Sequence, residues 1–324
     1  MKKRRIGNSD LEVAPLAFGG NVFGWTVDEQ TSFRLLDAFV DAGLNLIDTA
    51  DVYSVWHRGN QGGESEAIIG KWLKQSGKRD EVVVATKVGM KMSPSLGSES
   101  LSKSYIMKAV DQSLKRLRVD HIDLYQAHID DAKTPIEETL DAFSQLVKQG
   151  KVRALGASSY SRERLAQSLK ISEENGLARF DCLQPEYNLY ERENYEMTLE
   201  PLCVENGVAV ITYFSLARGF LSGKYRSEAD LAQSARGEGV KKYLNERGYR
   251  ILRALDQVAK DCRATPAQVA LAWLIARPSI TAPIASATGL NQLEDMVAAT
   301  KLRLDSSAIE LLNEASEYAA AAAR

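Results

Sequence analysis

The segment VVVAT (82–86), the amphipathic stretch from Ser104 to Leu117 and the run IDLYQ (122–126) decide the fold class. Both short runs are mostly apolar, as buried strands are, and the stretch between them has apolar residues at three- and four-residue steps, as a helix does. A strand, a helix and a second strand in this order predict two parallel neighbours joined by a crossover helix.

The same unit recurs on both sides of this segment. Further candidate strands run from Val13 to Phe18, Leu44 to Ile47, Val152 to Gly156, Cys182 to Gln184, Val208 to Thr212 and Ile280 to Pro283. Further helical patterns run from Thr31 to Ala42, Glu64 to Gln75, Ile136 to Lys148 and Arg162 to Asn175. The eight strands predict a (β/α)8 TIM barrel, a closed parallel sheet that forms one domain over residues 1–324.

An open doubly wound sheet is the rival fold, and it usually carries a glycine-rich nucleotide motif. The stretch GGNVFG (19–24) does not have the G-x-G-x-x-G spacing, and GFLSGKY (219–225) has too few residues between its glycines for a P-loop. We therefore expect the closed barrel.

Composition excludes several function classes. The net charge is −2 and the basic run at residues 2–5 is short, so neither nucleic acid nor a membrane surface is an expected partner. This run, from Lys2 to Arg5, is expected to be a solvated strand or turn.

No apolar run approaches the ~18 residues of a membrane helix, and no signal-peptide pattern follows the basic start, so we expect a cytoplasmic protein. The three cysteines form no C-x-x-C pair and the three histidines match no zinc spacing, so free buried cysteines and no metal site are predicted.

Ionisable residues follow three successive predicted strands. Asp48, Lys87 and His128 come at strand ends, and Tyr53 lies five residues after Asp48. Taken singly, each has a structural explanation: a turn cap, a surface lysine, a rim histidine or loop packing. Because the C-terminal ends of parallel strands meet at one face of a barrel, we expect the four side chains to converge there.

Their chemistry is mutually consistent. A phenol with a pKa of about 10 is a poor proton donor near neutral pH unless its phenolate is stabilised. At an effective dielectric of ~20, a lysine ammonium within about 4 Å supplies roughly 4 kcal/mol. Asp48 would keep Lys87 charged, and His128 would polarise a substrate carbonyl. A carbonyl-reduction site is the favoured interpretation, and a metal-free hydrolase that uses Asp48 and His128 without a nicotinamide stays open.

Four motifs resemble those of the aldo-keto reductase family: IDTADVY (47–53), GESE (63–66) with IG (69–70), ATK (85–87) and DLYQAH (123–128). The resemblance implies direct hydride transfer between NAD(P)H and an aldehyde or ketone, or the reverse alcohol oxidation, with Tyr53 as general acid and base. The catalytic set that it implies is Asp48, Tyr53, Lys87 and His128. The family also includes potassium-channel β subunits, so a cofactor-sensing regulatory role is the alternative.

The resemblance also implies cofactor contacts. Ser158, Ser159 and Gln184 match positions around the nicotinamide amide, and Ser159 stands where the family commonly has Asn. The other matching positions are Tyr213, which stacks on the ring, Gly20 and Asn21 at the nicotinamide end, Leu216, Arg218 and Lys224 near the pyrophosphate, and Ser286, Thr288, Gln292 and Asp295 at the adenosine end. No Lys or Arg lies between Ala285 and Met296. The resemblance implies NADPH or NADP+ as the expected cofactor, because this is the usual cofactor of the family, with NADH as the alternative.

Aromatic residues on the first two loops are expected to form the substrate wall, or equally to cover the barrel rim by packing: Phe23, Trp25, Val55, Trp56 and His57. The expected partner is a small-molecule aldehyde, ketone or sugar, and the sequence indicates neither its identity nor the oligomeric state. The alanine-rich tail from Tyr318 to Arg324 is expected to be a frayed helix end.

Overall fold

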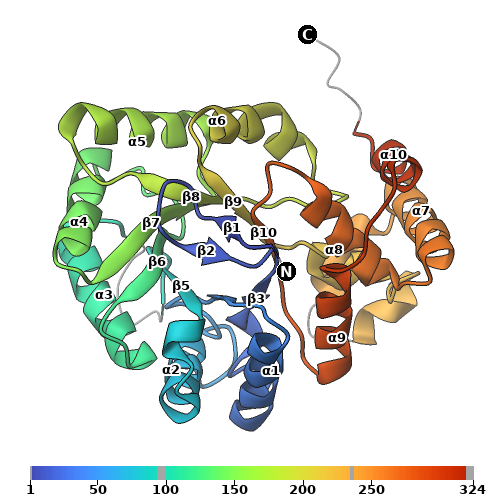
Figure 1. Ribbon diagram of the computed structural model, residues 1–324, viewed down its shortest axis with the longest axis horizontal. Helices are drawn as coiled ribbons and strands as arrows, with labels where there is room; N and C mark the ends of the chain where they lie inside the picture. The colour runs from blue at the N-terminus through green and yellow to red at the C-terminus, as the bar shows by residue number, and fades with distance from the viewer. Residues whose placement is uncertain (1, 93–99, 234–236, 319–324) are drawn as a thin grey trace.

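The computed structural model describes residues 2–92, 100–233 and 237–318, so the tail after Tyr318, where a frayed helix end was expected, lies outside the described residues. Eight parallel strands close into a barrel in the order β10, β3, β4, β5, β6, β7, β8, β9 (Figure 1). The barrel strands are β3 (Ala17–Gly19), β4 (Leu46–Asp48), β5 (Val83–Val88), β6 (Ile122–Ala127), β7 (Val152–Ser158), β8 (Phe180–Gln184), β9 (Ala209–Thr212) and β10 (Ala282–Ala285). The predicted (β/α)8 barrel is confirmed.

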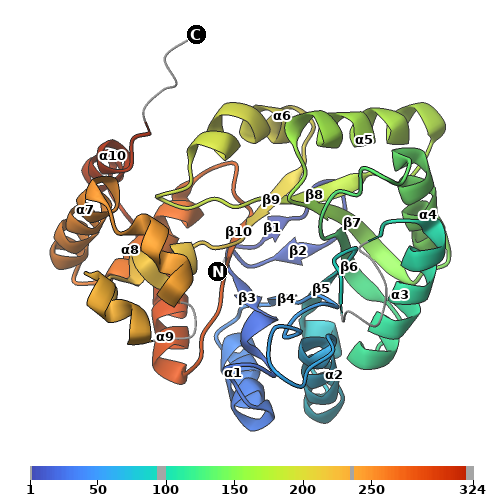
Figure 2. The same cartoon turned by 180° about the vertical axis from the view of Figure 1, so that it is seen from behind.

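Helices surround the strands on the outside, as both views show (Figures 1 and 2). They are α1 (Glu29–Asp41), α2 (Glu64–Ser76), α3 (Lys103–Leu117), α4 (Ile136–Lys148), α5 (Arg162–Asn175), α6 (Glu200–Glu205), α7 (Glu246–Cys262), α8 (Pro266–Ala276), α9 (Leu290–Ala299) and α10 (Ser306–Ala315). Side chains cap the starts of two helices: Asp28 caps α1 through the Thr31 amide, and Thr265 and Gln268 form a capping box on α8. None of the described helices combines the length and the apolar character needed to cross a lipid bilayer.

The first predicted strand, Val13 to Phe18, is wrong as a single element. The chain forms β2 (Glu12–Val13), which pairs antiparallel with β1 (Arg4–Arg5), and only then enters the barrel at β3. Pro15 interrupts the run because it has no amide hydrogen to donate to a neighbouring strand. The adjacent Ala14 amide donates instead to the side chain of Asn45 at 2.8 Å.

The β1–β2 hairpin covers the N-terminal end of the barrel. Its Arg4 is half-buried rather than fully solvated as the sequence suggested, because the guanidinium donates to the carbonyls of Ile275 and Ile280 at 2.8 and 2.7 Å. Arg5, one residue further, is exposed as expected. Ile6, Leu11 and Val13 of the hairpin belong to the same buried cluster as the side chains inside the barrel.

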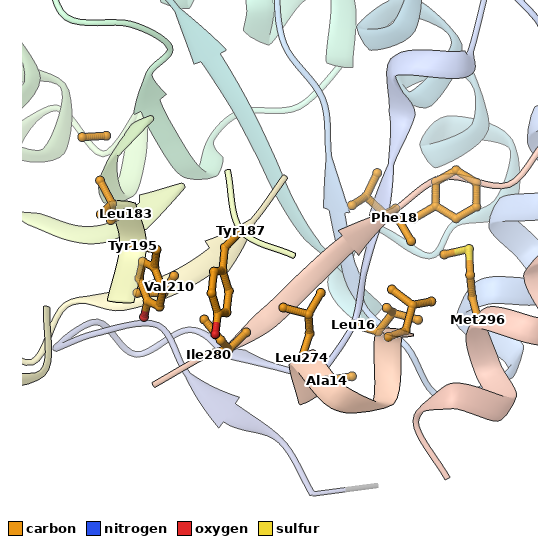
Figure 3. Packing of buried hydrophobic residues seen from close by; sticks show 14 of the residues in the cluster. Ala14, Leu16, Phe18, Leu183, Tyr187, Tyr195, Val210, Leu274, Ile280 and Met296 are labelled. Carbon is orange, nitrogen blue, oxygen red and sulfur yellow. The ribbon is translucent and has the colours of Figure 1, made fainter. Parts of the chain in front are cut away.

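Two apolar cores flank the strands. The inner one holds the inward side chains of the barrel, among them Leu46, Val83 and Leu124, and also the free Cys182. The outer one lies between strands and helices, and Figure 3 shows Leu16 and Phe18 beside Met296 of α9. Side chains alternate along each strand, so the inward positions recur every second residue. The next inward positions toward the C-terminal ends therefore form a separate layer above the inner core.

Candidate active site

A cavity of about 980 Å³ opens at the C-terminal ends of the barrel strands. Most of the residues singled out in the sequence line it: Asn21, Asp48, Tyr53, Val55, Trp56, His128, Ser158, Ser159, Gln184, Tyr213, Leu216, Arg218, Lys224, Ser286, Thr288, Gln292 and Asp295. Lys87 lies directly behind Tyr53, in contact with it. Residues far apart in the chain thus share one cavity because each follows a different strand.

The strand alternation explains why polar groups gather at the floor of this cavity. Leu46 and Ala85 point into the inner core, so Asp48 and Lys87, two residues further along the same strands, point into the layer above it. On β6 the same step leads from Leu124 to Gln126. An apolar inner core below and a polar layer above follow from one repeating pattern.

Lys87 is the centre of the polar layer. Its ammonium donates to Asp48 Oδ2 at 2.7 Å, to the carbonyl of Thr49 at 2.8 Å and to the phenol oxygen of Tyr53 at 2.8 Å. All three protons of the ammonium therefore have partners. The Lys87 and Asp48 side chains are 0% and 1% exposed, so this is a buried ion pair with satisfied hydrogen bonds.

Burial lowers the pKa of the Lys87 ammonium, and the neighbouring carboxylate of Asp48 opposes this effect. A lysine in this setting holds its proton less tightly than a surface lysine does. The Tyr53 oxygen consequently faces a group that can either donate a hydrogen bond or share a proton with it. This arrangement is suited to moving a proton at the phenol oxygen.

His128 lies on the cavity wall after β6, with its ring centroid 5.8 Å from that of Tyr53. Burial, and then the charge of Lys87, lower the pKa of the imidazole well below its usual value of 6.5. The ring is therefore neutral near pH 7, with one N–H to donate. The hydrogen bonds of Asp48 lead to Lys87, Tyr53, Gln184 and Gln126, so the Asp48–His128 pairing that a hydrolase would need is not assembled among the described residues.

Two buried amides complete the floor. Gln184 Nε2 donates to Asp48 Oδ1 at 2.9 Å and to Gln126 Oε1 at 3.3 Å, while Gln126 Nε2 reaches Asp48 Oδ1 at 3.4 Å. The sequence reasoning missed Gln126 because it considered ionisable residues at strand ends. The two-residue spacing from Leu124 through Gln126 to His128 is the signal that could have found it.

One wall of the cavity suits a nicotinamide ring. The Tyr213 side chain lies beside Ser159, whose hydroxyl is 3.5 Å from the tyrosine oxygen, and Ser158 Oγ donates to the Gln184 carbonyl at 3.0 Å. A flat aromatic surface, two hydroxyls and an amide form the kind of donor set that a planar carboxamide ring needs.

The cavity continues past cationic residues toward β10. Arg218 has a positive φ of 59°, and its guanidinium lies 4.1 Å from the centroid of the Phe214 ring. Lys224 also lines this part. Two cations beside turn backbone offer charge complementarity to a pyrophosphate, so the residues present fit a nicotinamide dinucleotide.

The far end of the cavity is polar and uncharged, apart from one carboxylate. Ser286 Oγ bonds with Asn21 Oδ1 at 2.7 Å, and the Thr288 amide donates to Gln292 Oε1 at 2.8 Å. Asp295 accepts from Gln268 Nε2 at 2.6 Å. Hydroxyl and amide groups rather than cations therefore face a ligand at this end.

The expected aromatic wall is only partly present. Trp56 is 47% exposed at the cavity and stacks edge-on against Trp25, with Val52, Val55, Met90 and Ile129 nearby on the lining. The residues that do not line the cavity are Gly20, Phe23, Trp25 and His57. Phe23 is fully buried and stacks on Phe18, and its carbonyl accepts from Ser54 Oγ at 2.6 Å. Its place is in the core that supports the Tyr53 loop, and His57 is exposed to solvent.

In the part of the chain that the structure describes, no group of three or more His, Cys, Asp or Glu side chains is arranged to hold a metal ion.

Comparison with known proteins agrees with the geometry. A model of the Aldo/keto reductase family matches residues 15–317. The chain is 35% identical to "Uncharacterized oxidoreductase YrpG" of Bacillus subtilis over 97% of this chain and 95% of that protein. It is 32% identical to "Aldo-keto reductase yakc [NADP(+)]" of Schizosaccharomyces pombe, covering 98% and 92% of the two chains. It is also 30% identical to "Probable voltage-gated potassium channel subunit beta" of Arabidopsis thaliana, over 91% and 90%. Because the family model covers residues 15–317 and these relatives are at least 30% identical over more than nine tenths of the chain, the chain belongs to the aldo/keto reductase family.

Proposed function

We propose that this protein is an NADPH-dependent carbonyl reductase that converts an aldehyde or ketone to an alcohol, and that runs the reverse oxidation with the same groups. The observation that carries this proposal is the Lys87 ammonium, which contacts both the Tyr53 phenol at 2.8 Å and the Asp48 carboxylate at 2.7 Å on the floor of the cavity. The cofactor, when bound, supplies or accepts the hydride.

The protein's own residues handle the proton. Tyr53 donates it to the oxygen that becomes the alcohol, and Lys87 stabilises the phenolate that remains. Asp48 keeps Lys87 charged and correctly oriented. The neutral imidazole of His128 donates a hydrogen bond to the substrate oxygen, which stabilises the negative charge that develops there.

The cofactor assignment rests on the donor set of the cavity. Ser158, Ser159, Gln184 and Tyr213 would hold the nicotinamide. Asn21 lines the cavity beside Ser286, to which it is bonded at 2.7 Å, whereas Gly20 does not line it. Leu216, Arg218 and Lys224 would hold the pyrophosphate, and Ser286, Thr288, Gln292 and Asp295 the adenosine end. The printed name of the Schizosaccharomyces pombe relative supports NADP(H). Fluorescence titration with NADPH and NADH tests this choice, and equal dissociation constants would refute the NADPH preference.

The proposed substrate is a small aldehyde, ketone or sugar with apolar surface near its carbonyl. Trp56, Val52, Val55 and Met90 would contact this surface, because they line the cavity on the side of Tyr53.

The proposed mechanism is tested with Tyr53→Phe. This variant should bind NADPH with nearly unchanged affinity and lose most of its NADPH oxidation in the presence of small aldehydes, since only the proton donor is removed. Activity near that of the wild type would rule out the mechanism.

A cofactor-sensing regulatory subunit is the second candidate, and the Arabidopsis thaliana relative with a channel-subunit name favours it. That role predicts tight NADPH binding without turnover of any aldehyde or ketone in a broad panel. Multiple turnovers with one carbonyl substrate support the enzyme instead.

A further inference from the structure

The Asp48 carboxylate has two differently held oxygens. Oδ2 accepts from Lys87 Nζ at 2.7 Å and from the Tyr53 phenol at 3.4 Å. Oδ1 faces away from this pair and accepts only amide hydrogens, from Gln184 Nε2 at 2.9 Å and from Gln126 Nε2 at 3.4 Å. A carboxylate buried this deeply loses stability if the lone pairs of one oxygen are left without donors.

The side-chain amide of Gln184 takes part in two interactions that compete for its N–H donors. In the proposed function its side chain binds the nicotinamide carboxamide, and in the structure its Nε2 holds Asp48 and the Gln126 carbonyl oxygen. A side-chain amide has two N–H donors, so an Nε2 that turns toward the cavity gives up at least one of these bonds.

Gln126 can replace Gln184 as the hydrogen-bond donor to Asp48 Oδ1. It is fully buried on β6, is absent from the lining of the cavity, and already directs its own Nε2 at Asp48 Oδ1 from a long 3.4 Å. When Gln184 turns away, nothing competes for that oxygen and the Gln126 bond can shorten. The donor that remains is one that no ligand can reach.

The Gln126 side chain fits beside strand β7 because the facing residue there, Gly156, has no side chain. Gln126 and Gly156 face each other in the β6–β7 register. A Cβ at position 156 would lie 2.8 Å from Gln126 Cγ, which is closer than such atoms pack, and 3.2 Å from both Gln126 Oε1 and the Cys182 carbonyl oxygen, which are tight contacts. Only glycine at this position leaves the Gln126 side chain where it is.

We infer that Gln126 is a positioning residue that holds Asp48, and through it the Lys87–Tyr53 pair, once a nicotinamide cofactor has drawn Gln184 away from Asp48. The inference rests on the proposed cofactor site. It gives the two glutamines unequal roles: Gln184 responds to the ligand, and Gln126 keeps the proton-transfer groups in register while it does so.

The first test needs no variant and no turnover. In 15N-labelled wild-type protein, the side-chain NH2 signals of Gln184 and Gln126 are recorded with and without NADP+. Signals of both residues should move on saturation, those of Gln126 downfield as its bond to Asp48 shortens. If NADP+ binds and the Gln126 signals stay in place, the inference is overturned and the proposed function stands. If NADP+ does not bind, the proposed cofactor site fails, and the inference with it.

The second test is kinetic. Gln126→Leu removes the donor and keeps an apolar side chain of similar size. It should lower kcat by about ten-fold or more, as expected for a lost hydrogen bond to a charged group, while the dissociation constant for NADPH and the KM for the carbonyl change by less than about three-fold. Gly156→Ala should lower kcat in the same direction, because it displaces the amide without removing it.

The matched control is Gln145→Leu, in which the lost amide donated to Asp141 on α4 at 2.9 Å, away from the cavity. This variant should keep the wild-type kcat. Thermal unfolding of all three variants separates misfolding from mispositioning. A folded Gln126→Leu protein with unchanged kcat, or with kcat and NADPH affinity lowered equally, would overturn the inference.

Discussion

The Lys87 ammonium donates to the Tyr53 phenol oxygen at 2.8 Å while it is paired with Asp48 at 2.7 Å. The aspartate ends β4 and the tyrosine lies on the loop that follows it, whereas the lysine belongs to β5. The contact therefore exists only when the barrel strands are in register. It links the stability of the polar layer to the chemistry of the phenol.

Replacing Lys87 separates these two effects. Lys87→Met should reduce carbonyl reduction by about a hundred-fold or more, and it should lower the free energy of unfolding by roughly 3–5 kcal/mol, because Asp48 is left as an unpaired buried charge. The double variant Asp48→Asn, Lys87→Met should regain much of the stability and none of the activity. Urea unfolding and NADPH oxidation assays measure both. Equal stability losses in the single and double variants would argue against the buried ion pair.

His128 should remain neutral through the physiological range. Burial and the charge of Lys87 hold the pKa of this imidazole well below its usual value, so its ring signals should not titrate between about pH 6 and pH 8. Proton NMR of the imidazole Hε1 resonances, assigned by comparison with His128→Ala, checks this. An inflection near pH 6.5 at the His128 signal would contradict the neutral donor.

Asp51 should make stability depend on pH in the opposite sense to most acids. Both carboxylate oxygens are buried and have no hydrogen-bond partner among the described residues. Burial, followed by the charge of Glu66, raises the pKa of this carboxyl well above its usual value. The native state therefore binds the proton more tightly than the unfolded chain, and the stabilisation present below about pH 4 is lost as pH rises through the native pKa.

Asp51→Asn removes that dependence. Relative to wild type, its free energy of unfolding should become increasingly larger as pH rises from about 4, so that the variant is the more stable protein, and the difference should level off above the native pKa. Denaturant unfolding at a series of pH values measures the trend. The exposed Asp80→Asn is the matched control and should run parallel to wild type. A constant difference between Asp51→Asn and wild type at every pH would disprove the assignment.

The hairpin at the other end of the barrel should influence stability alone. Arg4→Met removes the donors to the Ile275 and Ile280 carbonyls and should cost about 1–3 kcal/mol. Its kcat should equal that of wild type, since the proposed catalytic groups lie at the opposite strand ends. Arg5→Met, at the exposed neighbouring position, should change neither quantity. Loss of kcat in a folded Arg4→Met protein would contradict this separation.

Most of the site residues that could be predicted from the sequence lie at the C-terminal ends of strands. The positions of Asp48, Lys87 and His128 followed from the alternation of strands and helices, because parallel strands bring their C-terminal ends to one face. Ile136–Lys148 and Arg162–Asn175 are helices with the predicted bounds, since amphipathic spacing and local capping are encoded in neighbouring residues.

Other features depend on distant residues and could not be predicted in the same way. Phe23 is an aromatic residue of the kind that lines substrate pockets, yet its ring packs on Phe18. The Ser54 hydroxyl donates to the Phe23 carbonyl and holds the loop after β3 against the core. Arg4 belongs to a short basic run that is typical of solvated residues, yet the carbonyls that its guanidinium binds lie more than 270 positions away in the chain. The spacing along β6 could have placed Gln126 in the polar layer, but the room for its side chain depends on Gly156 of the neighbouring strand β7.

The hairpin that covers the N-terminal end leaves the barrel with its cavity open at the opposite face. Two ligands that share this cavity enter and leave on the same side, so the one that occupies the floor beside Gln184 has to arrive before the one that rests against Trp56. Departure follows the reverse sequence. For the cofactor and the carbonyl of the proposed function, we therefore expect a compulsory order in steady-state kinetics, in which the first ligand to bind is also the last to be released.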